Sequence, residues 1–105
     1  MRAAEGFTRV LHEIQAERAA ALLRIAGTLE DLIGQLHRLA REAAAAPDAG
    51  ERSRARERHQ ALRQRALRYR WYLEVQRESV GLTRHEALDE LYPVPGRLGR
   101  DPVLP

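Results

Sequence analysis

Apolar residues recur at alternating spacings of three and four along two long segments of the chain. The first row consists of Leu22, Ile25, Leu29, Leu32, Leu36, Leu39 and Ala43. The second row consists of Ala55, His59, Leu62, Ala66, Tyr69, Leu73, Gln76 and Val80. This spacing places each row on one side of an α-helix and is typical of helices that pack side by side. The pattern predicts one helix over about residues 7–46 and a second over about residues 49–80.

The segment between these helices contains Pro47 and Gly50, which both interrupt helices. Asp48 is followed three residues later by Glu51, the spacing of a capping box, so we expect Asp48 to be the N-cap of the second helix. A connection this short makes the two helices antiparallel neighbours. Gly81 stands where a glycine commonly ends a helix.

A short third helix is predicted over about residues 84–91, because Thr83 and Glu86 have the spacing of a second capping box. With a hinge near Pro47, the first helix extends beyond the second by about two turns, given 3.6 residues per turn. We expect the third helix to fill this gap. The predicted contacts place Leu88, Leu91 and Tyr92 against Phe7, Val10 and Leu11.

The first helix has a wider apolar face than one antiparallel partner can cover. A second row beside the main one includes Leu23, Ala26, Ile33 and Ala40. We predict that the chain forms a homodimer through this row, as a four-helix bundle. The predicted fold is all-α, with a long antiparallel helical hairpin and a short third helix in one domain over residues 1–92. Residues 93–105 contain four prolines and two glycines, which predicts an extended tail.

Composition narrows the class of protein. Of the 105 residues, 44% are hydrophobic and 31% are charged, which indicates a globular chain. Cysteine is absent, which excludes disulfides and thiolate metal sites. We find neither a signal-peptide pattern nor an apolar run of the roughly 20 residues that a membrane span needs. These features lead us to expect a cytoplasmic protein with no membrane contact.

Arginine is concentrated in the second helix, where residues 52–71 include eight arginines. Guanidinium groups bind phosphate, and the neighbouring aromatic residues could stack on bases. The candidate nucleic-acid contacts are Arg52, Arg56, Arg63, Arg65, Arg68 and Arg70. The competing interpretation is a solvated face paired with acids, because the net charge of the chain is only +3. We favour this second interpretation and keep nucleic-acid binding as the alternative.

Trp71 offers a different candidate site. The phase that buries Tyr69 and Leu73 turns Trp71 outward, where Leu67 and Val75 extend it into a second apolar stripe. An outward tryptophan indicates a contact with the tail, a second subunit or another protein. In the tail, Tyr92, Pro93 and Pro95 are further candidates for partner binding, and residues 102–105 form a PxxP element.

Candidate catalytic chemistry is sparse. His59 lies in the second row, and we expect it to be buried and hydrogen-bonded, because none of the four histidines has the Glu-x-x-His or His-x-x-x-His spacing of helical metal sites. We predict no catalytic residue, no metal and no cofactor. The sequence thus favours a non-enzymatic helical module for protein–protein interaction or assembly.

Overall fold

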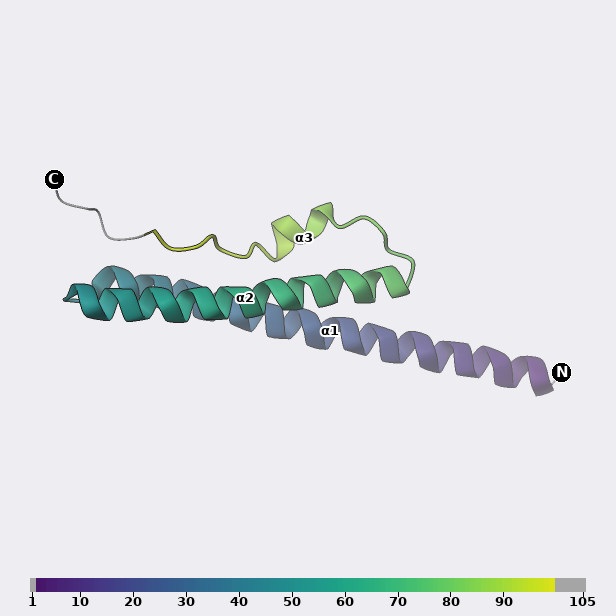
Figure 1. Ribbon diagram of the computed structural model, residues 1–105. Coiled ribbons are helices and arrows are strands. Elements are labelled where there is room, and N and C mark those ends of the chain that lie inside the picture. The colour runs from purple at the N-terminus through teal and green to yellow at the C-terminus, as the bar shows by residue number, and fades with distance from the viewer. Residues whose placement is uncertain (1, 100–105) are drawn as a thin grey trace.

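The chain folds as an antiparallel pair of long helices with a third, short helix beside them (Figure 1). The computed structural model describes residues 2–99. Within that range, α1 spans Arg2–Ala45, α2 spans Ala49–Ser79 and α3 spans Glu86–Leu91, and there is no strand. The predicted all-helical hairpin is confirmed. The helix boundaries agree with the prediction within two residues, except that α1 begins at Arg2 rather than near Phe7.

The sharp turn between α1 and α2 follows from Pro47 and Asp48. A proline disfavours helical backbone in the residue before it, which is why α1 ends at Ala45. Asp48 has an extended backbone, and its carboxylate accepts a hydrogen bond of 2.8 Å from the amide of Glu51. Asp48 is therefore the N-cap of α2, as predicted.

Replacing Asp48 with alanine should lower the free energy of unfolding by about 1 kcal/mol, because an orphan amide of the first turn loses its acceptor. Asp48→Asn should retain most of the stability, since the amide oxygen can accept the same bond. Chemical denaturation followed by circular dichroism measures both variants. Equal losses in the two variants would contradict a capping role.

At its other end, α2 closes with a Schellman motif around Gly81. Gly81 has a φ of 90°, a left-handed conformation that glycine adopts without strain. The Gly81 amide donates to the Glu78 carbonyl, and the Leu82 amide donates to the Arg77 carbonyl. Arg18 of α1 also donates to the Ser79 carbonyl at 3.1 Å, so a positive charge lies at the negative end of the α2 dipole.

The two rows of apolar residues form the interface between α1 and α2. The buried members are Leu29, Leu32, Leu36 and Ala43 on α1, and Ala55, His59, Ala66 and Leu73 on α2. Burial of each large aliphatic side chain contributes about 1.5–3 kcal/mol to folding. The predicted rows are therefore the structural basis of the hairpin. In the row predicted for the second helix, only Val80 is exposed.

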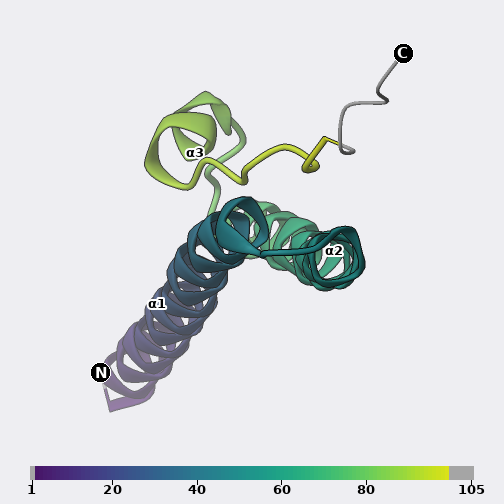
Figure 2. The ribbon, with the colours of Figure 1, turned by 90° about the vertical axis from the view of Figure 1, so that its left-hand side faces the viewer.

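The position of α3 differs from the prediction. The chain reverses after Gly81, so α3 lies along the middle of the hairpin rather than against the N-terminal part of α1 (Figures 1 and 2). Leu88 is 2% exposed and joins the core cluster that contains Leu29, Leu32 and Leu36. The predicted contacts of α3 with Phe7, Val10 and Leu11 are thus wrong, because the hairpin core offers Leu88 a deeper site.

The start of α3 also differs from the prediction. His85 is its N-cap, with no side-chain hydrogen bond, so the capping box from Thr83 to Glu86 does not form. Arg77 of α2 instead donates to the Arg84 carbonyl at 2.7 Å. A helix beginning at Arg84 would use this carbonyl as a hydrogen-bond acceptor, but Arg77 already occupies it. The third helix begins at Glu86 instead.

Candidate partner-binding surface

An apolar stripe lies on the outer side of α2, as the helical phase predicted. Trp71 is 58% exposed, Val75 is 40% exposed and Leu67 is 36% exposed. The Trp71 ring rests at a centroid distance of 5.6 Å from Tyr72, which in turn meets Tyr69 edge-on at 5.4 Å. The aromatic contacts connect the exposed tryptophan to the partly buried Tyr69.

A shallow hollow of about 360 Å³ adjoins this stripe, between α2, α3 and the segment that follows α3. Its lining consists of Leu67, Arg70, Trp71, Glu74, Asp89 and Val94. We call this hollow together with Val75 the Trp71 surface. Sequence reasoning identified the stripe but missed the contributions of Asp89 and Val94, since these depend on how α3 folds back.

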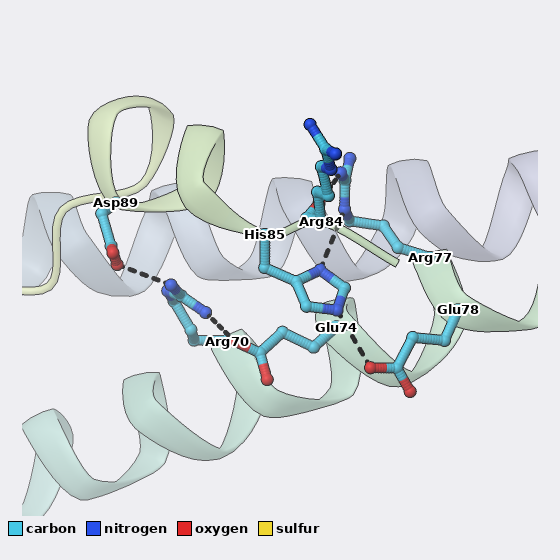
Figure 3. Close-up of polar contacts among 7 residues, drawn as sticks. All are labelled: Arg70, Glu74, Arg77, Glu78, Arg84, His85 and Asp89. Atoms are coloured by element: carbon cyan, nitrogen blue, oxygen red, sulfur yellow. Dashed lines mark hydrogen bonds and ion pairs between the residues drawn. The ribbon is translucent and has the colours of Figure 1, made fainter. Parts of the chain in front are cut away.

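Arg70 fixes the charged side of the hollow (Figure 3). Its guanidinium bonds to Glu74 on its own helix and to Asp89 on α3, both at 2.5 Å. Arg70 and Glu74 are four residues apart, the spacing at which opposite charges on a helix lie side by side. Burial alone would lower the pKa of Arg70, but the hydrogen bonds and charges of Asp89 and Glu74 outweigh it and raise that pKa. Arg70 therefore stays charged and positions both carboxylates.

A second polar cluster holds the beginning of α3 against the end of α2 (Figure 3). The His85 ring lies between the two helices, with Nε2 at 3.0 Å from Glu78 and Nδ1 at 3.5 Å from Arg77. Arg77 also holds the Arg84 carbonyl. Together with the Arg70 pair and buried Leu88, these contacts set α3 at a defined place beside Trp71.

The tail residues that the sequence singled out have mixed surroundings. Tyr92 is partly buried and packs with Val94 against the core cluster, whereas Pro93 is exposed. The Pro95 carbonyl accepts a hydrogen bond of 2.9 Å from Arg63 of α2. Residues 93–99 carry neither helix nor strand, and the predicted PxxP element at 102–105 lies outside the described residues.

The six candidate arginines of α2 do not share one surface role. Arg52 donates to the Ala46 carbonyl, Arg63 to Pro95, and Arg65 lies over the Tyr69 ring at 5.8 Å. Arg70 is committed to two carboxylates, as described above. Arg56 is partly buried, and Arg68 is exposed. Intramolecular contacts thus use much of the guanidinium capacity that phosphate binding would need.

The second row of α1 is largely covered from within the chain. Ala26 and Ile33 are partly buried and pack against the cluster that includes Leu88. Ala40 is also partly buried, whereas Leu23 is 75% exposed. The row does need more than one partner helix, and the segment around α3 supplies part of that cover. A dimer through these four residues remains a prediction.

His59 is completely buried, as predicted, but its expected hydrogen bond is missing. Among residues 2–99, neither ring nitrogen has a hydrogen-bond partner. Burial lowers the pKa of the His59 imidazole, and the positive charges of Arg63 and His37 lower it further. The same part of the chain contains no group of three or more histidine or acidic side chains placed to hold a metal ion, and no helix long and apolar enough to cross a membrane.

Comparison with protein-family models, curated proteins and solved structures finds no significant match to this chain.

Proposed function

We propose that this protein is a non-enzymatic interaction module that binds a protein partner at the Trp71 surface. The observation that carries the proposal is the exposure of Trp71 beside a hollow whose apolar and charged walls are held in place by α3. Tryptophan is among the residues that most often dominate the binding energy of protein interfaces.

The distribution of polarity around Trp71 supports this proposal. Interfaces combine an apolar centre with a polar rim. Here Leu67, Trp71 and Val94 form the apolar centre, and the Arg70–Asp89 pair forms part of the rim. Because the hydrogen bonds of Arg70 fix the rim before binding, a partner loses less free energy in ordering it.

A protein partner fits the surface better than nucleic acid does. Arg63, Arg65 and Arg70 already have intramolecular contacts, and the apolar stripe offers no phosphate ligand. Binding through an apolar centre should change little with salt, whereas phosphate contacts release counterions and weaken steeply as salt rises. Salt dependence is therefore the property that separates the two modes.

We expect Trp71→Ala to weaken partner binding at least tenfold, which corresponds to about 1.4 kcal/mol. The test immobilises the full chain, captures proteins from the cells that make it at low and high salt, and quantifies each captured protein. Leu23→Ala is the matched control, because Leu23 is an exposed apolar residue of α1 that lies outside the Trp71 surface.

The proposal holds if a protein captured by the wild type and by Leu23→Ala is lost from Trp71→Ala and withstands high salt. Identical capture by all three forms would show that Trp71 is not the binding residue. Capture of nucleic acid that high salt removes would instead assign the binding to the arginines.

A further inference from the structure

The charges that line the hollow of the Trp71 surface do not balance. The lining contains one basic residue, Arg70, and two acidic residues, Glu74 and Asp89. One positive charge against two negative charges leaves a net charge of −1, even though the Arg70 guanidinium bonds to both carboxylates. The whole chain, in contrast, carries a net charge of +3. The hollow is therefore a negative site on a positive protein.

The Asp89 carboxylate can accept a further hydrogen bond (Figure 3). Its side chain is 78% exposed, and its bond to Arg70 uses only the Oδ1 atom. Among residues 2–99, the Oδ2 atom has no hydrogen-bond partner. An ionised carboxylate only accepts hydrogen bonds, and it accepts them most strongly from a charged donor. Asp89 thus offers an open acceptor for a cationic group in the hollow.

Trp71 supplies a second group that attracts cations. Its side chain is exposed and lines the same hollow as Asp89. The negative face of an indole binds guanidinium and ammonium groups better than the rings of phenylalanine and tyrosine do. Tyr69 has such a cation within the chain, because Arg65 lies over its ring at 5.8 Å. Within residues 2–99, no cationic side chain lies over the Trp71 ring.

The charged residues around the hollow favour a cation on the side of α3. All the charged residues of this helix are acidic, namely Glu86, Asp89 and Glu90. On α2, Arg68 is exposed and precedes Trp71 by three residues, but it does not line the hollow. Phosphate and carboxylate groups are therefore disfavoured in the hollow, and a positive group is favoured there.

The apolar part of the hollow favours arginine as that positive group. Leu67 and Val94 line the hollow beside the charged residues. An arginine side chain combines an apolar stem, which can lie on such residues, with a planar charged head. That head can stack on an indole while it donates two parallel hydrogen bonds to a carboxylate, which an ammonium group cannot do.

We propose that the partner of the Trp71 surface inserts an arginine into the hollow, with its guanidinium between the Trp71 ring and the Asp89 carboxylate. Apolar residues beside this arginine in the partner pack on Leu67 and Val94. The inference rests on the proposed function and names the chemistry of the partner, an exposed segment in which apolar residues flank an arginine. One ion pair of this kind weakens with salt far less than a set of phosphate contacts does.

Peptide binding to the full chain tests the preference for arginine. Trp71 is the only tryptophan of the chain, so tryptophan fluorescence reports on this surface alone. The probes are three end-blocked tripeptides that carry arginine, citrulline or glutamate between two leucines. Citrulline has nearly the shape of arginine without its charge. The arginine peptide should bind more tightly than the citrulline peptide by about threefold or more, the factor expected of one exposed ion pair with a cation–π contact.

Substitutions on α3 assign the preference to one carboxylate. Asp89→Asn should bring the affinities for the arginine and citrulline peptides close together, although the amide oxygen can still accept the bond from Arg70. Asp89→Glu should restore the preference for arginine. Glu90→Gln is the matched control and should keep that preference, because Glu90 is an exposed acid of the same helix that does not line the hollow.

The outcomes separate this inference from the proposed function. Equal binding of the arginine and citrulline peptides to the wild type would overturn the inference and keep the Trp71 surface as a binding site. Binding of none of the peptides would also overturn it, whereas the proposed function is decided by the capture experiment with Trp71→Ala. A preference that Glu90→Gln removes and Asp89→Asn does not would place the arginine elsewhere and overturn the assignment.

Ionic quenchers of fluorescence test the sign of the charge at Trp71 without any peptide. Caesium and iodide ions are compared, each relative to its quenching of free, end-blocked tryptophan. Caesium should be the more effective quencher of Trp71, because the hollow attracts cations, and Asp89→Asn should reduce its advantage. Stronger quenching by iodide, the result that the net charge of +3 alone would give, would overturn the inference.

Discussion

The free energy of unfolding is expected to fall by about 2–5 kcal/mol when Leu29 is replaced by alanine. Leu29 is 0% exposed and lies in the cluster where residues of α1, α2 and α3 meet. Its truncation removes buried methyl groups and leaves a cavity that two rigid helices cannot fully close. Because domains of this size are stable by only about 5–15 kcal/mol, the loss is a large share of the total.

Urea denaturation at a fixed protein concentration measures this effect, since self-association would make stability depend on concentration. Leu23→Ala is the control on the same helix, and its effect should stay within about 0.5 kcal/mol because the side chain is largely exposed. Equal effects of the two substitutions would show that the main row of α1 is not the interior of the protein.

The hairpin could be predicted from the sequence because its determinants are local. The alternating spacing of three and four places Leu29 and Leu36 on one side of a helix wherever that helix lies. Asp48 caps α2 through an amide only three residues away. Such features survive any change in the rest of the fold, and the prediction of the two rows was therefore confirmed.

The position of α3 could not be predicted in the same way. Its six residues contain one fully buried side chain, Leu88, and nothing in the local pattern says which part of the hairpin will receive it. The direction of the chain after Gly81, the bond of Arg77 to Arg84 just before α3, and the bond of Arg70 to Asp89 on α3 decide its position. The length by which α1 extends beyond α2 suggested that α3 would pack against the N-terminal part of α1, and that prediction was wrong.

The candidate site was likewise predicted only in part. The outward direction of Trp71 follows from the phase of α2 and was predicted. The hollow beside it depends on Asp89 and Val94, which reach Trp71 only because α3 folds back. Burial of His59 followed from its place in the row on α2, but the lack of a partner for its ring nitrogens among residues 2–99 is a property of three-dimensional packing.

Because the buried His59 ring has no hydrogen-bond partner among residues 2–99, we expect it to make the free energy of unfolding depend on pH. The pKa of the folded-state His59 ring lies below the ordinary value of 6.5, first because the ring is buried and then because of electrostatic repulsion from Arg63 and His37. Above about pH 6.5 the ring is neutral in the folded and unfolded chains, and stability is at its full value. As the pH falls below 6.5, the unfolded chain binds the proton first, so the folded state loses stability until the pH reaches the folded pKa.

We therefore expect the free energy of unfolding to decrease as the pH falls below about 6.5, with a slope of at most about 1.4 kcal/mol per pH unit from this group. His59→Leu should flatten this part of the profile. It should also raise the stability at pH 7 by about 1–3 kcal/mol, because a buried polar group without a partner is removed. Denaturation series at several pH values measure both effects.

His12→Gln provides the control, because it removes a histidine from an exposed position near the beginning of α1, away from the interface between α1 and α2. If His59→Leu kept the wild-type slope, another group would be responsible for the acid sensitivity. If it lowered the stability at pH 7, the imidazole would have a polar partner in solution, and the histidine would hold the two helices together rather than weaken them. The sign of the change in stability at neutral pH therefore shows whether the packing of α2 against α1 is weakened by His59 or depends on it.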